Sequence, residues 1–333
     1  MKVFLSHTPE MRANYYGERA LAALREVADV RTNDADAVLS GAALAAAAAG
    51  CAVIVADRMT PGTPDTFAAA PDLVAFLRCA VDVSTIDIDA ASRHGVLVTQ
   101  ATPGFAASVA EIGIGFMIDL SRGISRNVLA YRTGGKPEAR MGRQLAGSTI
   151  GIVGYGEIGR RLAAHAVALG MRVLVSDPYA KIEAGAAEQV SLDALLDGAD
   201  FVVCLALATP ETENLFDAAA FARMRRGAYF VNLSRGQLVD EDALAAALDS
   251  GALGGAAMDV GRAPDQKPSP SLARRPDVIA TPHTGGLTPG AVQHQALDTV
   301  EQVRSLAGGR LPQGALNTAA ASRLTRLGID PGA

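Results

Sequence analysis

An arginine and a histidine each follow an apolar run of the kind that forms a buried strand. Arg235 stands in the segment NLSRG, directly after apolar residues 227–231. His283 stands in the segment TPHTGG, where proline and glycine fix a turn after another apolar run. Open α/β sheets bind ligands at the carboxyl ends of their strands, so both side chains are predicted to face a ligand. A guanidinium can hold a carboxylate or polarise a carbonyl, and an imidazole can transfer a proton near neutral pH.

A glycine-rich turn, GYGEIG at residues 154–159, lies between an apolar run and a helical pattern. Gly154 permits a sharp turn, Gly156 lets the backbone approach a pyrophosphate, and Gly159 lets the helix pack on its strand. The helix N-terminus offers free N–H groups to phosphates. The segment therefore predicts a dinucleotide site whose residues are Gly154, Tyr155, Gly156, Glu157, Ile158 and Gly159.

Asp177 ends the next apolar run, 18 residues after Gly159. A carboxylate at this place can accept both ribose hydroxyls of the dinucleotide. It would also repel a 2′-phosphate, which favours NAD over NADP, although Arg160 and Lys181 nearby weaken that preference. With a nicotinamide in reach, His283 has the character of the proton donor that carbonyl reduction needs. Asp259, at the end of the strand-like run AAMDV, could accept a hydrogen bond from the carboxamide or cap a loop.

The elements that must position these residues alternate between strands and helices. Residues 1–100 predict a small parallel α/β domain, with strands at 2–5, 52–56, 74–78 and 95–99 and helices at 18–27 and 41–49. From residue 149, six strands near Ile150, Val173, Val202, Phe230, Ala257 and Ile279 suit a dinucleotide-binding sheet. A helix at 108–121 is predicted to lead into this second domain. Residues 131–147 are expected to form a loop or arm, and a helix at 291–307 is expected to return to the first domain.

Composition excludes several other classes of protein. The 333 residues suggest two domains, and the net charge of −5 argues against a nucleic-acid partner. No signal peptide or stretch long enough to span a membrane is recognised, so no membrane partner is expected. The three cysteines lie in apolar runs without metal or redox spacing, which favours reduced thiols, a cytoplasmic location and no metal.

In this order the motifs resemble those of the D-2-hydroxyacid dehydrogenase family, which includes phosphoglycerate, glycerate and D-lactate dehydrogenases. The resemblance covers nearly the whole chain and rests on VAE (109–111), GYGEIG (154–159), TPET (209–212), NLSRG (232–236), DV (259–260) and TPHTGG (281–286). It implies two Rossmann-like domains: an NAD-binding, doubly wound parallel sheet at residues 103–287, and a flavodoxin-like substrate domain formed by residues 1–102 plus 288–333. It also implies a homodimer formed through the NAD-binding domains.

The resemblance assigns a role to each candidate catalytic residue. Arg235 would hold the substrate carboxylate and carbonyl, His283 would pass the proton, and Asp259 would orient the nicotinamide. Backbone N–H groups of Val81 and Asp82 would bind the substrate carboxylate. The expected reaction is hydride transfer between NAD(H) and a 2-oxo or 2-hydroxy acid.

Three departures from the family pattern leave alternatives open. The glutamate that pairs with the histidine is replaced by Pro264, so Asp265 is predicted as its catalytic substitute, with Gln266 as a weaker candidate. Asp82 stands in the usually glycine-rich substrate loop, where its side chain would repel a carboxylate unless it is turned away or unless the substrate carries a positive group. The tryptophan often found in the arm is missing. The alternatives are a non-catalytic NAD(H)-binding regulatory protein on the same fold, or a dehydrogenase of another small acid such as formate or phosphite.

Overall fold

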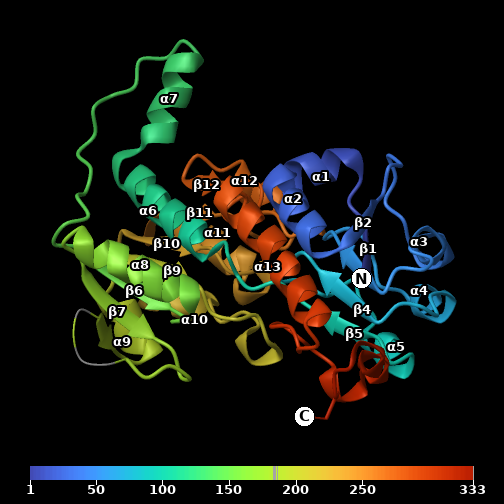
Figure 1. Ribbon diagram of the computed structural model, residues 1–333. Helices are drawn as coiled ribbons and strands as arrows, with labels where there is room; N and C mark the ends of the chain where they lie inside the picture. Colours follow the sequence, from blue (N-terminus) through green and yellow to red (C-terminus); the bar gives the residue numbers. More distant parts are fainter. Residues whose placement is uncertain (183–184, 186, 333) are drawn as a thin grey trace. The chain divides into compact units, whose positions relative to one another are not determined.

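Short apolar runs separated by helices give this chain two parallel β-sheets, which confirms the predicted α/β fold class. The computed structural model describes residues 1–182, 185 and 187–332 (Figure 1). Met1–Gly104 and Pro289–Ala333 form one compact unit, and Phe105–Thr288 form a second. Among the described residues, no helix is long and apolar enough to cross a membrane.

The first unit holds a five-stranded sheet in the order β2-β1-β3-β4-β5. Its strands are β1 (Lys2–Leu5), β2 (Asp29–Thr32), β3 (Val53–Ala56), β4 (Ala75–Arg78) and β5 (Leu97–Thr99). Its helices are α1 (Pro9–Tyr15), α2 (Gly17–Val27), α3 (Gly41–Ala47), α4 (Pro64–Ala69), α5 (Ile88–Arg93) and α13 (Pro289–Ala307), and the 3₁₀ turns η3 (Thr318–Ala320) and η4 (Ser322–Leu327) follow α13.

Alternate strand residues point to opposite faces of this sheet, so each face has its own core. Val53 and Val55 of β3 pack with α2 and α13 on one face. Ile54 and Ala56 of the same strand pack with α3, α4 and α5 on the other. Because α13 comes from the far end of the chain, both ends of the sequence build this unit.

The second unit holds a seven-stranded sheet in the order β12-β11-β10-β9-β6-β7-β8. Its strands are β6 (Thr149–Val153), β7 (Arg172–Ser176), β8 (Ala187–Gln189), β9 (Phe201–Cys204), β10 (Ala228–Asn232), β11 (Leu253–Met258) and β12 (Val278–Ala280). Its helices are α6 (Ala106–Arg122), α7 (Ile124–Arg132), α8 (Glu157–Ala168), α9 (Leu192–Gly198), α10 (Ala218–Arg223), α11 (Glu241–Asp249) and α12 (Pro270–Ala273), with 3₁₀ turns η1 (Pro210–Thr212) and η2 (Gly236–Leu238).

Helices cover both faces of this sheet (Figure 1). α6 and α8 pack on one face, against Ile150 and Ile152 of β6. α9, α10 and α11 pack on the other face, around Phe230 of β10. The expectation of six strands was wrong by one, because the edge strand β8 adds a seventh. The helix α7 was also not predicted, and it ends at Arg132, inside the segment expected to be a loop.

Candidate active site

The glycine-rich turn joins β6, the strand at the middle of the order β9-β6-β7, to the N-terminus of α8. Gly154 has φ = 101°, a left-handed conformation that favours glycine. A Cβ at Gly159 would lie 2.3 Å from the carbonyl oxygen of Gly154, so only glycine lets α8 approach the turn this closely. Beyond Gly156 itself, its two chain neighbours and the adjoining helix backbone, no described atom lies within 4 Å of the place a Cβ would occupy at Gly156. This open side fits the close approach of a pyrophosphate to the backbone.

Asp177 directly follows β7 and faces the glycine turn. Its Oδ2 accepts the N–H of Tyr155 at 2.7 Å, and its Oδ1 accepts those of Tyr179 at 2.8 Å and Ala180 at 3.0 Å. Burial raises the pKa of this carboxyl, but the three N–H donors and Arg160 outweigh burial and hold the pKa below its usual value. Asp177 is therefore an ionised acid that holds the glycine turn in place, and its contact with a ribose stays a prediction.

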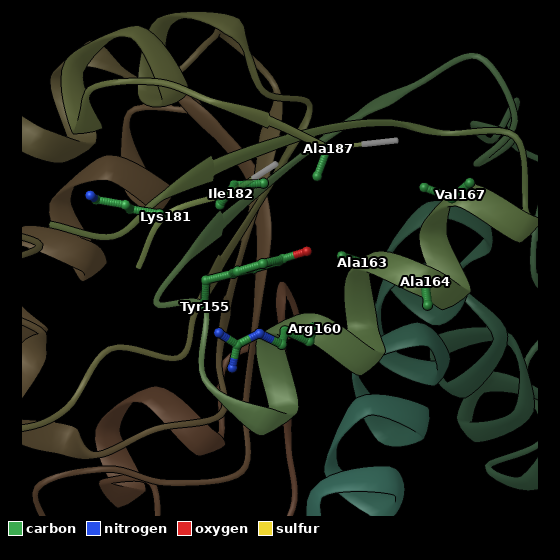
Figure 2. A pocket seen from close by; sticks show the side chains of 8 residues that line it. All are labelled: Tyr155, Arg160, Ala163, Ala164, Val167, Lys181, Ile182 and Ala187. Atoms are coloured by element: carbon green, nitrogen blue, oxygen red, sulfur yellow. The ribbon is translucent and has the colours of Figure 1, made fainter. Parts of the chain in front are cut away.

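A pocket of about 580 Å³ lies beside the turn, on the side of α8 (Figure 2). The Tyr155 ring projects across it, and the Arg160 guanidinium lies 5.4 Å from the centre of that ring. Lys181 also lines the pocket, and the remaining described lining residues are Ala163, Ala164, Val167, Ile182 and Ala187. Both cations that weaken the predicted preference for NAD therefore lie next to the turn.

Arg235 stands in a turn that directly follows β10 and leads into η2. Asn232 holds this turn at both ends: its Nδ2 donates to the carbonyl of Arg235 at 3.0 Å, and its Oδ1 accepts the N–H of Ser234 at 3.0 Å. The guanidinium is exposed and donates to the Ser234 carbonyl at 2.8 Å. A Cβ at Gly236 would lie 2.2 Å from the backbone of Gly261, so this turn packs directly on the loop that follows β11.

Asp259 follows β11 and fastens the turn that carries the histidine. Its carboxylate is 4% exposed and accepts the Thr281 hydroxyl at 2.5 Å and the backbone N–H groups of Thr284 and Gly285 at 2.8 Å each. Three donors to one buried carboxylate make this a strong, charge-assisted anchor. Of the two roles considered for Asp259, the structure shows the loop cap, and contact with a carboxamide stays a prediction.

His283 lies in that anchored turn, directly after β12. Its φ of 60° is unusual for a residue with a side chain, and its N–H donates to the Thr281 carbonyl at 3.0 Å. Such strain persists only where surrounding structure enforces it, here through Asp259. Because β10, β11 and β12 are neighbours, Arg235, Asp259 and His283 stand on three successive loops at one edge of the sheet.

Comparison with known protein families identifies the family of this chain. Residues 114–285, more than half of the chain, match the family described as "D-isomer specific 2-hydroxyacid dehydrogenase, NAD binding domain". The chain belongs to this family. The predicted family, its oxidoreductase class and the NAD cofactor are thereby confirmed.

Several 2-hydroxyacid dehydrogenases resemble the chain along most of its length. It is 34% identical to an (S)-sulfolactate dehydrogenase of Chromohalobacter salexigens over 90% of this chain and 98% of that one. It is 31% identical to D-3-phosphoglycerate dehydrogenase 2 of Arabidopsis thaliana over 90% of this chain, but it spans only about half (49%) of that relative's length. A solved structure, a putative D-isomer specific 2-hydroxyacid dehydrogenase from Polaromonas, matches with a TM-score of 0.81 at 26% identity, over 95% of this chain and 99% of that one.

Two of the departures from the 2-hydroxyacid dehydrogenase pattern now have a structural description. Asp265, the predicted catalytic substitute for the family glutamate, is exposed and pairs with Lys267, Oδ2 to Nζ at 2.7 Å, and its catalytic role stays a prediction. The next residue, Gln266, has φ = 62° and a buried Oε1 without a hydrogen-bond partner among the described residues. In the first unit, Oδ1 of Asp82 accepts the N–H of Ser84 at 2.9 Å, so this carboxylate is turned back onto its own loop.

Two exposed apolar side chains beside the glycine turn are not indicated by any motif of the sequence. Tyr179 follows β7 and is 96% exposed, and Leu207 follows β9 and is 80% exposed. These strands flank β6 on either side. Exposed apolar side chains on both sides of β6 are suited to contact the two flat faces of a nucleotide base. The exposure of Tyr179 and Leu207 could not be read from the sequence.

Proposed function

We propose that this protein is an NAD-dependent D-2-hydroxyacid dehydrogenase that acts as a 2-oxoacid reductase. The observation that carries the proposal is the edge formed by the loops after β10, β11 and β12, with Arg235, Asp259 and His283 in the same unit as an NAD-binding turn. Within the proposal, residues 103–287 are the NAD-binding domain, and residues 1–102 with 288–333 are the substrate domain.

Each residue has a chemical task in the proposed reaction. The glycine turn and the N-terminus of α8 receive the pyrophosphate, Asp177 accepts the ribose hydroxyls, and Tyr179 and Leu207 contact the adenine. NADH supplies the hydride when bound. Arg235 holds the substrate carboxylate and polarises the carbonyl, while protonated His283 donates its proton to the carbonyl oxygen. In the substrate domain, the backbone N–H groups of Val81 and Asp82 bind the carboxylate.

The test is NADH consumption with a panel of small, hydroxylated, acidic and aromatic 2-oxo acids. His283→Ala is expected to lower kcat by ~10²–10⁴-fold, as expected for the loss of a general acid. Arg235→Ala is expected to raise KM and lower kcat. The exposed histidine His165, in the same unit, provides a matched control as His165→Ala. Parental turnover by His283→Ala would refute the proposed mechanism.

Oxidation of another small acid is a second candidate. Its support is the loop after β11, where Asp265 is bound to Lys267 while the amide oxygen of Gln266 is buried. In formate dehydrogenases, which share this scaffold, a glutamine pairs with the histidine. Formate and phosphite with NAD therefore belong in the panel. Tight NADH binding without turnover of any compound would favour the NAD(H)-binding regulatory protein.

We propose a homodimer formed through the NAD-binding domains. Support comes from α7 and the segment after it, where large apolar side chains are exposed: Ile124, Val128, Leu129, Tyr131 and Met141. A second copy would cover them, because a monomer rarely exposes so many together. Light scattering after gel filtration is expected to give twice the chain mass, and Leu129→Asp is expected to give a monomer. A monomeric parent protein would refute the dimer.

We propose a cytoplasmic location and no nucleic-acid partner, and two further features support this proposal. Cys51, Cys79 and Cys204 are all buried free thiols, which supports a reducing cytoplasm. The net charge of −5 supports the absence of a nucleic-acid partner. Cell fractionation and a filter-binding assay with DNA and RNA test these two points.

A further inference from the structure

Arg78, the last residue of β4, is completely buried in the first unit, with an exposed fraction of 0%. It ends a strand whose other three residues, Ala75, Phe76 and Leu77, are apolar and also buried. Taking a guanidinium out of water costs several kcal/mol unless its charge is compensated and its N–H groups are bonded. The presence of an arginine here therefore calls for a specific set of partners.

The Arg78 guanidinium joins the loops that follow β3 and β4. One Nη donates to the backbone carbonyl of Asp57, directly after β3, and the other donates to the Thr85 hydroxyl at 2.7 Å. Burial lowers the pKa of Arg78, and the negative charges of Asp57 and Asp82 oppose that shift. The guanidinium thus lies in the field of two carboxylates, one from each loop.

Further hydrogen bonds hold the loops after β3 and β4 close to the Arg78 guanidinium. The Asp57 carboxylate is 4% exposed and accepts the Ser6 hydroxyl at 2.9 Å and the Met59 N–H at 2.7 Å. The Thr85 carbonyl accepts the N–H of Gly62 at 3.1 Å, which ties the two loops together a second time. Thr85 itself is exposed, so hydrogen bonds rather than side-chain packing hold it in place.

The segment held in this way is residues 79–85, the loop that carries Val81 and Asp82. Its first part is fixed by backbone bonds: Cys79 N–H donates to the Ala56 carbonyl at 2.8 Å, and the Ala80 carbonyl accepts from Ala101 at 3.0 Å. The C-terminal end of the loop is held by the hydrogen bond that Arg78 donates to the Thr85 hydroxyl. A cation under the loop also offsets the charge of Asp82, which would otherwise disfavour an anionic ligand.

We propose that Arg78 is a positioning residue for substrate: through Thr85 it holds the 79–85 loop in the shape in which its N–H groups bind a carboxylate. The inference rests on the proposed function, since the loop's ligand there is the carboxylate of a 2-oxo acid. Arg78 contacts no reacting atom. It acts on the loop through its hydrogen bond to Thr85 and through its positive charge.

Thr85→Val is the sharpest test, because it removes one hydroxyl acceptor from an exposed position and keeps the shape of the side chain. Loss of a hydrogen bond to a charged group is expected to raise KM for the 2-oxo acid by roughly tenfold. The kcat value and the NADH dissociation constant are expected to stay within twofold, since the NAD-binding turn lies in the other unit. Arg78→Lys, which keeps the charge but loses the fork, is expected to raise KM in the same way. Thr325→Val, exposed in the same unit, is the matched control.

Hydrogen exchange provides a readout that needs no turnover. In Thr85→Val, the N–H groups of residues 81–85 are expected to exchange faster than in the parent, with exchange in residues 105–288 unchanged. An unchanged KM together with unchanged exchange would overturn the inference. A parent protein that reduces none of the 2-oxo acids would refute the proposed function instead, and exchange would then decide the role of Arg78 alone.

Discussion

His7 should make the first unit lose stability in mild acid. The side chain follows β1, is 1% exposed, and makes an edge contact with the Tyr16 ring at 5.1 Å between centroids. Burial lowers the pKa of His7 to about 4; Asp57 raises it, while Arg12 and Arg78 lower it. The histidine is therefore neutral in the folded protein at neutral pH.

The sign and size of the effect follow from proton linkage. An unfolded histidine titrates near 6.5, so between pH 6.5 and 4 the unfolded chain binds more protons than the folded one. The free energy of unfolding therefore falls as pH falls through this window. A difference of roughly 2.5 pKa units corresponds to about 3 kcal/mol.

The assay compares the parent with His7→Asn, which cannot titrate, in urea unfolding at pH 7.5 and pH 4.5. Peptide-level hydrogen exchange reads the two units separately, because a single transition is not assured in a two-unit chain. The parent should lose about 2.5 kcal/mol more than the variant between these pH values, because titration of the folded histidine is not complete at pH 4.5. The exposed His165→Asn is the control and should behave as the parent does. Equal losses in the parent and His7→Asn would refute the reasoning.

Three further predictions concern the second unit. Gly159→Ala puts a Cβ 2.3 Å from the Gly154 carbonyl, and calorimetry should show NADH binding weakened at least ~10-fold; an unchanged dissociation constant would contradict the packing argument. Asp259→Asn can turn an NH2 donor toward the Gly285 N–H in place of an acceptor. Steady-state kinetics should show kcat/KM lowered by at least ~10-fold. Parental kinetics would show that Asp259 does not position His283. Asp240→Ala removes the carboxylate that caps the N-terminus of α11 and accepts the N–H of Ala243. Urea unfolding should show a loss of about 1 kcal/mol in the free energy of unfolding, with NADH binding retained. No loss would mean that the cap does not stabilise the unit.

The sequence was sufficient to predict features that depend on one residue type and on its near neighbours in the chain. Gly159 is needed because α8 touches the Gly154 carbonyl, and this close approach is what the glycine pattern encodes. Asp240 directly precedes the acidic first turn of α11, a pattern typical of an N-cap, and its carboxylate accepts the N–H groups of Asp242 and Ala243. Such signals depend on neighbours a few residues away, which the sequence displays directly.

Features that depend on distant neighbours were missed. The strand β8 has three residues, Ala187–Gln189, half-buried or exposed, so it forms because β7 offers an edge and not because of an apolar run. The sequence also did not show that Asp265 forms an ion pair with Lys267, and the role of Asp265 as a substitute for the family glutamate stays a prediction. The contacts of Arg78 could not be predicted from the sequence, because its partners Asp57 and Thr85 lie on two loops that only the fold brings together.

The first unit's construction from both chain ends has a consequence for biosynthesis. Tyr16 forms a hydrogen bond with Thr299, and Thr99 of β5 forms a β-bridge with Ala315, so the early sheet lacks α13 and this bridge until the last part of the chain is made. At ribosomal speeds of about 5–20 residues per second, the intervening segment Phe105–Thr288 takes roughly ten to forty seconds to synthesise. During that interval the continuous second unit can fold by itself, while the sheet face around Val53 and Val55 is covered by α2 and lacks α13. The nascent first unit is therefore the part of the chain with the greatest need for a chaperone.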